Sequence, residues 1–155
     1  MSDKTLAMRL LEGKRIPYTV AAYPAAIKDA EAVAAAVGQP AASVFKTLVV
    51  DRAPEKPLLV LVPANRQLNL KQLAKAVGAK KLKLATQERA EALTGLQVGG
   101  ISPLALLNKG FVIYCDVTVR DQDRICLSAG QRGLQIILNP ADLLRLTGAR
   151  LAPVT

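Results

Sequence analysis

The sequence predicts a single α+β domain built on a curved, mostly antiparallel mixed β-sheet, barrel-like in shape and flanked by helices. Its 155 residues, 51% of them hydrophobic, are enough to bury one sizeable core. Apolar β-branched segments and alanine- or leucine-rich helical segments are mixed without the strict alternation of a parallel α/β fold. No repeat or long linker divides the chain, so residues 1–155 are expected to form one domain.

The first part of the chain is expected to mix short helices with strands. Glycine after a helical segment stops it, because glycine adopts left-handed backbone at little steric cost. Pro17, which cannot donate to a strand ladder, places the first strand at a sheet edge. We therefore expect helices over residues 5–12 and 29–37, and strands over residues 16–20, 43–50 and 58–62.

The second part contains further helix caps and strand patterns. Asn69 is placed to begin a helix over residues 70–77, and Thr86 is placed to begin another. Alternating apolar residues predict a long strand over 111–119 that forms a hairpin with 124–127 across a short polar turn. The remaining expected elements are short strands over 82–85 and 134–138 and a helix that starts at Asn139-Pro140 and ends at Thr147.

A lysine lies inside one of the most apolar strands, Ser43–Val50. Because side chains alternate across a strand, Lys46 shares a face with Val44 and Leu48. An ammonium group on such a face costs free energy unless an anionic group or a wet cleft receives it. Two interpretations follow: Lys46 faces a pocket for an anionic or carbonyl-bearing substrate, or its stem covers apolar surface while its head reaches solvent.

The composition excludes several kinds of catalysis. The chain has no histidine, so it has neither a histidine general base nor a Ser-His-Asp or Cys-His arrangement. Cys115 and Cys126 are not in a CxxC pattern, and we expect two buried free thiols rather than a disulfide or metal site. We expect neither a metal ion nor another cofactor, and any catalysis must use lysine, carboxylates, backbone dipoles or the substrate itself.

The charge of the chain suggests a polyanionic partner. The net charge is +9, and the densest basic cluster comprises Lys71, Lys75, Lys80, Lys81 and Lys83. This cluster is either a patch for a phosphate backbone or an ordinary solvated helix face. We see no signal peptide and no segment of membrane-spanning length, and we therefore expect a cytoplasmic protein.

Glycine-rich loops offer a second candidate for chemistry. Thr94–Pro103 contains three glycines, and the Gly99-Gly100 pair allows close backbone approach and positive φ. Such loops present bare N–H groups to an anion or a carbonyl oxygen, although a plain helix-to-strand connection has the same composition. Residues 128–133 form a second glycine-bearing loop.

These segments together resemble a known family. Val44–Val50, Leu68–Lys71, Val98–Pro103 and Ser128–Leu134 occur in the order and spacing of the YbaK/EbsC-type aminoacyl-tRNA deacylases. These proteins are relatives of the editing domain inserted in bacterial prolyl-tRNA synthetases, and the resemblance covers about residues 6–151. It implies trans-editing, the hydrolysis of the ester that joins a wrong amino acid to tRNA. The expected substrate is cysteine on the proline tRNA, with alanine on the same tRNA as the alternative.

The resemblance also assigns roles to residues. Lys46 matches the lysine that this family requires, and we expect it to bind the phosphate or ribose end of the acylated terminal adenosine. The chemistry is expected to be substrate-assisted, with the ribose 2′-hydroxyl or the thiol of a cysteine substrate in place of a histidine. The expected residues are Lys46 and Gly100 for catalysis, Tyr23, Thr47, Gly99, Ile101, Ser102 and Pro103 for substrate binding, and, from the basic cluster, Lys71, Lys75, Lys80 and Lys81 for tRNA binding.

Other functions stay open at this point. The protein could dock on tRNA or on prolyl-tRNA synthetase without hydrolysing anything, in which case loss of Lys46 would be tolerated. It could also be an unrelated lysine enzyme, in which a desolvated Lys46 forms a Schiff base with a carbonyl substrate. Some family members carry an acidic residue where this chain has Gln135, so the amino acid removed is left open.

Overall fold

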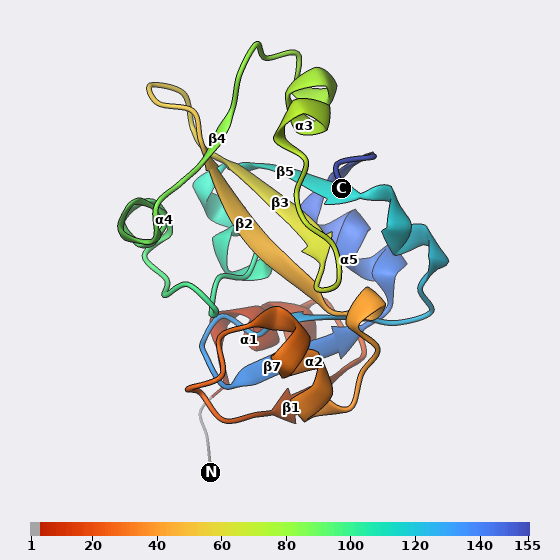
Figure 1. Ribbon diagram of the computed structural model, residues 1–155. Helices are drawn as coiled ribbons and strands as arrows, with labels where there is room; N and C mark the ends of the chain where they lie inside the picture. The colour runs from red at the N-terminus through yellow and green to blue at the C-terminus, as the bar shows by residue number, and fades with distance from the viewer. Residues whose placement is uncertain (1–3) are drawn as a thin grey trace.

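The computed structural model describes residues 4–155, which fold into two β-sheets and surrounding short helices (Figure 1). The helices are α1 (Leu6–Gly13), α2 (Ala30–Val37), α3 (Leu70–Val77), α4 (Gln87–Thr94) and α5 (Pro140–Thr147), with the 3₁₀ turns η1 (Ala41–Ser43), η2 (Leu104–Lys109) and η3 (Val117–Asp121). The strands are β1 (Tyr18–Ala22), β2 (Phe45–Asp51), β3 (Leu58–Pro63), β4 (Lys83–Leu84), β5 (Val112–Asp116), β6 (Ile125–Ser128), β7 (Leu134–Leu138) and β8 (Arg150–Ala152).

The helix caps confirm the predicted helix boundaries. Asn69 accepts a hydrogen bond from the Gln72 N–H at the start of α3, and Gly78 ends that helix in the left-handed conformation. The same side-chain cap occurs at the N-termini of the other α-helices, because each starts with a residue whose oxygen can accept from a free N–H group. These caps are Thr5, Asp29, Thr86 and Asn139.

The strands form two open sheets rather than one barrel-like sheet. The three-stranded sheet has the order β1-β7-β6, and the five-stranded sheet has the order β4-β2-β3-β5-β8. Pairing is mixed and mostly antiparallel, as predicted, with β3, β5 and β8 parallel. An isolated bridge between Val44 and Cys126 joins the sheets where β2 passes β6. The α+β class is confirmed, but neither sheet of the described chain closes on itself, so the barrel-like shape is not.

The predicted hairpin between residues 111–119 and 124–127 is wrong. Strand β5 ends at Asp116, whose carboxylate accepts from the Thr118 hydroxyl at 2.6 Å and from the Val154 N–H at 3.0 Å. The bond to Thr118 starts η3, and the bond to Val154 holds the C-terminal segment against β5. Strand β8, which was not predicted from the sequence, pairs there in parallel with β5. Strand β6 instead crosses to the other sheet and pairs with β7.

Each face of the five-stranded sheet packs against a different layer. One face, with Phe45, Val49 and Leu61, packs against the three-stranded sheet, α1 and α5 in the larger core. The opposite face, with Val50 and Val60, packs against α3. Lys46 and Leu48 lie on this second face by strand alternation, four and two residues before Val50.

Two further sequence expectations can be judged from the fold. Cys115 and Cys126 are both buried and free, which confirms the prediction of two free thiols. Within residues 4–155, no helix combines the length and the apolar character needed to span a bilayer.

Candidate active site

A cavity of about 240 Å³ lies beside the first residues of β2. In Figure 1 this is the region where β2 starts, close to α2 and to the three-stranded sheet. Its walls come from the entry to α2, the start of β2, the first glycine loop and strands β6 and β7. The residues that line it are Tyr23, Lys28, Asp29, Ala30, Val33, Val44, Phe45, Lys46, Thr47, Leu48, Val98, Gly99, Ile101, Ser128 and Gln135.

The cavity exists because one edge of β2 has a gap in its pairing. Strand β3 pairs with β2 from Phe45 to Val50, whereas β4, on the other side, pairs only with Val50 and Asp51. Lys46 therefore lies on a stretch of strand whose second edge faces the cavity instead of a neighbouring strand. Its side chain is half-buried, and no carboxylate of the described residues lies within salt-bridge distance of its ammonium group.

Thr47 adds an unpaired hydroxyl to the same strand segment. Its Oγ1 atom is buried and has no hydrogen-bond partner among the described residues. A buried polar atom without a partner costs about 1–3 kcal/mol, so such atoms are rare outside functional sites. Both residues line the cavity, so its wall contains the Lys46 side chain and a strand position at which a buried hydroxyl lacks a partner.

The first glycine loop forms a tight turn against the cavity. The Gly100 N–H donates to the Gln97 carbonyl at 2.7 Å, and Gly99 has a φ of +92°. A Cβ atom on Gly100 would lie 2.9 Å from the backbone nitrogen of Arg132, so only glycine fits there. The Gly100 N–H is therefore already bonded within the turn, and Gly100 contributes to the shape of the loop. The neighbouring residues Gly99 and Ile101 line the cavity.

Two charged side chains hold this loop in place. The Val98 carbonyl accepts from Arg132 Nε at 2.8 Å, and the Val98 N–H donates to Glu91 Oε2 at 2.9 Å. Arg132 belongs to the second glycine loop, so the two loops predicted separately are joined here. Sequence reasoning missed both residues, since their role depends on contacts between segments that are distant in the chain.

Two predicted substrate-binding residues lie behind the cavity wall. Ser102 is fully buried, and its Oγ accepts from the Leu104 N–H at 3.2 Å. Pro103 precedes η2 as its N-cap. Both residues direct the chain away from the cavity into η2. The structure thus brings Tyr23, Lys46, Thr47, Gly99 and Ile101 together at the cavity, whereas Gly100, Ser102 and Pro103 are not among the residues that line it.

The three-stranded sheet contributes polar groups that were not predicted as site residues. Gln135 is buried in β7, and its Oε1 accepts from the Cys126 thiol at 3.4 Å. The Ser128 hydroxyl accepts from the Gly130 N–H at 3.1 Å. Burial raises the pKa of Cys126 to about 12, so this thiol stays protonated at neutral pH and is not a nucleophile. A glutamine inside the apolar strand 134–138 was the signal that could have revealed this wall.

The entry to α2 places opposite charges at the cavity. Lys28 and Asp29 are exposed and line it. Asp29 caps α2 by accepting from the Ala32 N–H at 3.0 Å, which fixes one of its carboxylate oxygens. Among the described residues, Asp29 is the carboxylate at this cavity, where it can meet a cationic group of a ligand.

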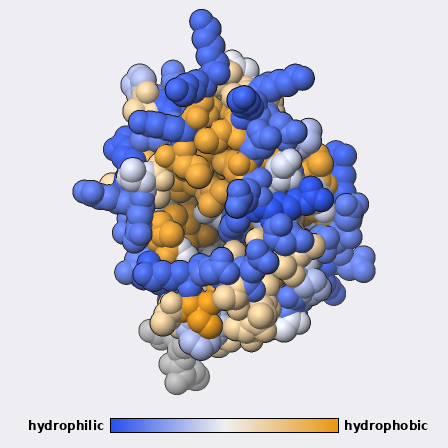
Figure 2. Space-filling model, in the orientation of Figure 1, coloured by the Kyte–Doolittle hydropathy of each residue, from blue (hydrophilic) through white to orange (hydrophobic). Residues whose placement is uncertain are grey.

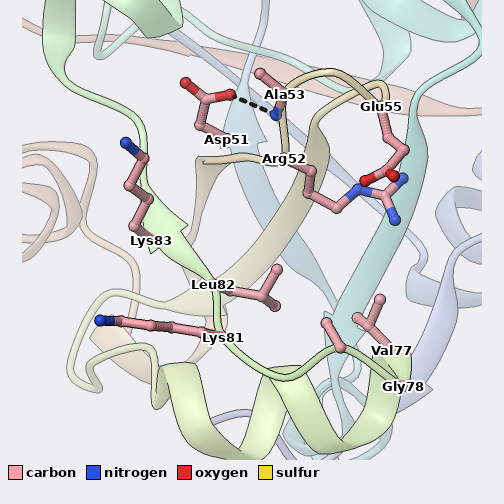
Figure 3. Close-up of a pocket in the computed structure, with 10 residues that line it drawn as sticks. Asp51, Arg52, Ala53, Glu55, Val77, Gly78, Lys81, Leu82 and Lys83 are labelled. Atoms are coloured by element: carbon pink, nitrogen blue, oxygen red, sulfur yellow. Dashed lines mark hydrogen bonds between the residues drawn. The ribbon is translucent and has the colours of Figure 1, made fainter.

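The predicted tRNA-binding lysines lie elsewhere. Lys71 and Lys75 are exposed on α3, and Lys80 and Lys81 are exposed in the connection to β4. A second, open hollow of about 600 Å³ has Lys81 in its wall and lies at the other end of β2, where Asp51 lines it (Figure 3). No group of three or more His, Cys, Asp or Glu in the described chain is arranged to hold a metal ion.

Comparison with known proteins identifies the family. The model of the family described as "Aminoacyl-tRNA editing domain" matches residues 24–146, which include both glycine loops and every cavity-lining residue except Tyr23. The chain belongs to this family. The resemblance inferred from the sequence motifs is therefore confirmed.

Individual relatives agree with this assignment. Over 155 residues the chain is 38% identical to the Enterococcus faecalis protein named "Putative Cys-tRNA(Pro)/Cys-tRNA(Cys) deacylase EbsC", covering 99% of this chain and 94% of that protein. It is 32% identical over 110 residues to a proline–tRNA ligase of Shouchella clausii, covering 71% of this chain and 19% of the ligase. The crystal structure of "a putative trans-editing enzyme for prolyl tRNA synthetase" superposes with a TM-score of 0.82 at 28% identity, covering 99% of each chain.

Proposed function

We propose that this protein is a trans-editing aminoacyl-tRNA deacylase that hydrolyses cysteine from the proline tRNA. The observation on which this proposal depends is a small cavity at an open edge of β2, lined by the half-buried Lys46 and by Thr47, whose buried hydroxyl has no partner among the described residues. Family membership supports the reaction class, and the name of the Enterococcus faecalis relative supports cysteine and the proline tRNA. We place the activity in the cytoplasm, where tRNA is aminoacylated.

The size and polarity of the cavity suit the acylated end of a tRNA. A volume of about 240 Å³ is below the range of about 300–1,000 Å³ typical of sites for drug-sized ligands. The cavity therefore fits an amino acid and its ribose, while the rest of the nucleotide stays outside. We assign the ribose or the terminal phosphate to Lys46, the α-ammonium group of the amino acid to Asp29, and the ester carbonyl to the loop at Gly99 and Ile101.

The reaction needs no protein nucleophile. Water adds to the ester carbonyl carbon, the bond between this carbon and the ribose oxygen breaks, and the products are the free amino acid and a tRNA with a restored hydroxyl. The chain has no histidine to accept the proton of the attacking water. We assign this proton transfer to the substrate, through the ribose 2′-hydroxyl or the cysteine thiol, while Lys46 and the loop stabilise the charge that develops on oxygen.

The substrate preference follows from pocket fit and is the first property to measure. Proline tRNA charged with cysteine, alanine or proline is incubated with the protein, with and without prolyl-tRNA synthetase, and loss of the ester is followed. We expect the cysteine ester to disappear fastest and the proline ester to survive. Faster loss of the alanine ester would reassign the substrate, because a small pocket separates such side chains weakly. Survival of all three esters would contradict the proposal.

A further inference from the structure

The excess of positive charge is concentrated in one segment of the chain. Residues 56–87 contain seven Lys or Arg and no Asp or Glu, whereas the rest of the chain has 14 basic and 12 acidic residues. Most of the net charge of +9 therefore belongs to β3, α3, β4 and the loops between them. Five lysines of this segment are exposed and take part in no salt bridge within the described chain; we call them the lysine face: Lys71, Lys75, Lys80, Lys81 and Lys83.

The lysines on α3, Lys71 and Lys75, lie on the same side of the five-stranded sheet as Lys46, whereas Lys83 pairs with Asp51 at the sheet edge and faces the other side. Lys46, Leu48 and Val50 alternate onto the face that α3 covers, since Val50 packs in the same cluster as Leu73 of α3. Leu48 is only half-buried there, so the strand between Lys46 and the lysine face presents apolar surface. Figure 2 shows this side of the molecule, with an apolar area in the middle and hydrophilic side chains around it.

The two sites lie at opposite ends of β2. The strand runs from Lys46, at the cavity, to Asp51, at the open hollow beside Lys81 and Lys83. Five residues of extended strand span about 17 Å. Figure 3 shows Lys81 and Lys83 reaching to one side of the chain at the start of β4, whereas Leu82 points to the other side, toward Val77.

Acidic groups at the hollow are partly compensated. The Asp51 carboxylate accepts from the Ala53 N–H at 3.1 Å and pairs with Arg89 at 3.2 Å. The hydrogen bond from Ala53, followed by Arg89 and Lys83, keeps the pKa of Asp51 below its usual range. The charge of Asp51 is therefore matched locally, and Arg52, Lys81 and Lys83 at the hollow outnumber its two carboxylates, Asp51 and Glu55.

We propose that the lysine face binds the phosphate backbone of an RNA stem whose 3′ end occupies the Lys46 cavity. This inference rests on the proposed function, because the acylated end must be the one in the cavity. The unpaired 3′ end of a tRNA, about four nucleotides, spans about 14 Å when stacked at about 3.4 Å per nucleotide. That length is close to the roughly 17 Å of strand between the cavity and the hollow. With the 3′ end in the cavity, the first base pairs of the stem would therefore lie at the lysine face. The lysines contact phosphates and supply affinity without reading sequence.

The test measures RNA binding without any hydrolysis. Uncharged proline tRNA is titrated with the wild-type protein and with the triple variant Lys75→Gln/Lys80→Gln/Lys81→Gln at several salt concentrations. A matched variant, Arg9→Gln/Lys14→Gln/Arg124→Gln, removes the same charge from exposed positions outside the segment. Removing one lysine that binds a phosphate reduces the slope of log affinity against log salt by about one. We therefore expect a slope shallower by about three and a weaker affinity in the first variant alone.

Two outcomes of the RNA titration would overturn the inference. If both variants keep the unfolding transition of the wild type and lose RNA affinity to the same extent, or neither loses any, the lysine face is not the RNA site. An acidic protein surface would then be the better partner for it. Because uncharged tRNA carries no ester, failure of the deacylase proposal leaves this measurement readable, and hydrolysis with unaltered RNA binding contradicts the lysine face alone.

Discussion

The cavity and the lysine face represent two ways of building a functional surface at the two ends of one strand. The cavity brings together residues from the entry to α2, from β2, from the first glycine loop and from the second sheet, and it half-buries a single cation, Lys46. The lysine face comes from one continuous segment and leaves all of its cations exposed. The first arrangement fixes geometry and suits chemistry, whereas the second supplies charge and suits affinity. Substitutions should therefore have large, specific effects in the cavity and small, additive, salt-dependent effects on the lysine face.

The largest effect is expected at Lys46. The variant Lys46→Ala should hydrolyse the cysteine ester at least about a hundredfold more slowly, the loss typical of removing one stabilising group from a developing oxyanion. Its affinity for uncharged tRNA should fall far less, because Lys46 supplies only one of several contacts to the RNA. Single-turnover hydrolysis and RNA titration measure the two properties separately. Lys28→Ala, which removes an exposed cation from the same cavity, is the control and should lose much less. Full activity of a folded Lys46→Ala protein would remove Lys46 from the mechanism.

The next effect concerns the shape of the cavity. In Gly100→Ala the new methyl group would lie within about 3 Å of the backbone of Gln131 and Arg132, which cannot move aside easily. We expect the free energy of unfolding to fall by about 1–3 kcal/mol and hydrolysis to slow as the loop shifts. Gly13→Ala is the matched control, because nothing lies within 4 Å of its Cβ position. Equal denaturation curves for the two variants would show that the loop tolerates the methyl group.

A smaller effect is expected at Asp29. The variant Asp29→Asn keeps the helix cap, since asparagine caps as well as aspartate, but removes the charge assigned to the substrate ammonium group. An exposed ion pair contributes modestly, so KM for the cysteine ester should rise about two- to fivefold. The preference for a free over an N-acetylated aminoacyl ester should fall by a similar factor. An unchanged preference would place the ammonium group elsewhere, and Asp123→Asn, at an exposed site outside the cavity, is the control.

The smallest effect is expected when the two buried cysteines are exposed to a thiol-alkylating reagent. Burial raises the pKa values of Cys115 and Cys126 to about 12, so both thiols are protonated from neutral pH to well above pH 9. We expect iodoacetamide at pH 8 to leave the native protein unlabelled and fully active. Protein unfolded in urea should be labelled at both positions, as mass spectrometry can show. Rapid labelling of Cys126 in the native state, with loss of activity, would mean that its thiol is open to the cavity.

The parts of the site that could be predicted share a local signal. Lys46 is a cation in an apolar strand, and Gly99 lies in a glycine pair. Both signals are visible within a few residues of sequence. The helix caps were predicted for the same reason, because a cap depends on neighbouring residues.

The parts that could not be predicted depend on contacts between distant segments. Gln135 and Ser128 reach the cavity only because the second sheet packs against the start of β2. Residues 121–123 resemble a hairpin turn, yet the bonds of Asp116 to Thr118 and Val154 send the chain to the other sheet. The lysine cluster was visible in the sequence, but the position of Lys71 and Lys75 on the Lys46 side of the sheet, and of Lys83 at its edge, required the strand register.

The separation of chemistry from affinity is tested most directly with a substrate that lacks the RNA stem. The wild-type protein is given cysteinyl-adenosine ester and cysteine-charged proline tRNA, and kcat/KM is measured for each from about 0.05 to 0.5 M salt, where screening of exposed charges strengthens. We predict hydrolysis of both substrates, with a steep decrease in kcat/KM with salt for the tRNA and almost none for the adenosine ester. Equal salt dependence of the two, or hydrolysis of the tRNA alone, would contradict the division between the cavity and the lysine face.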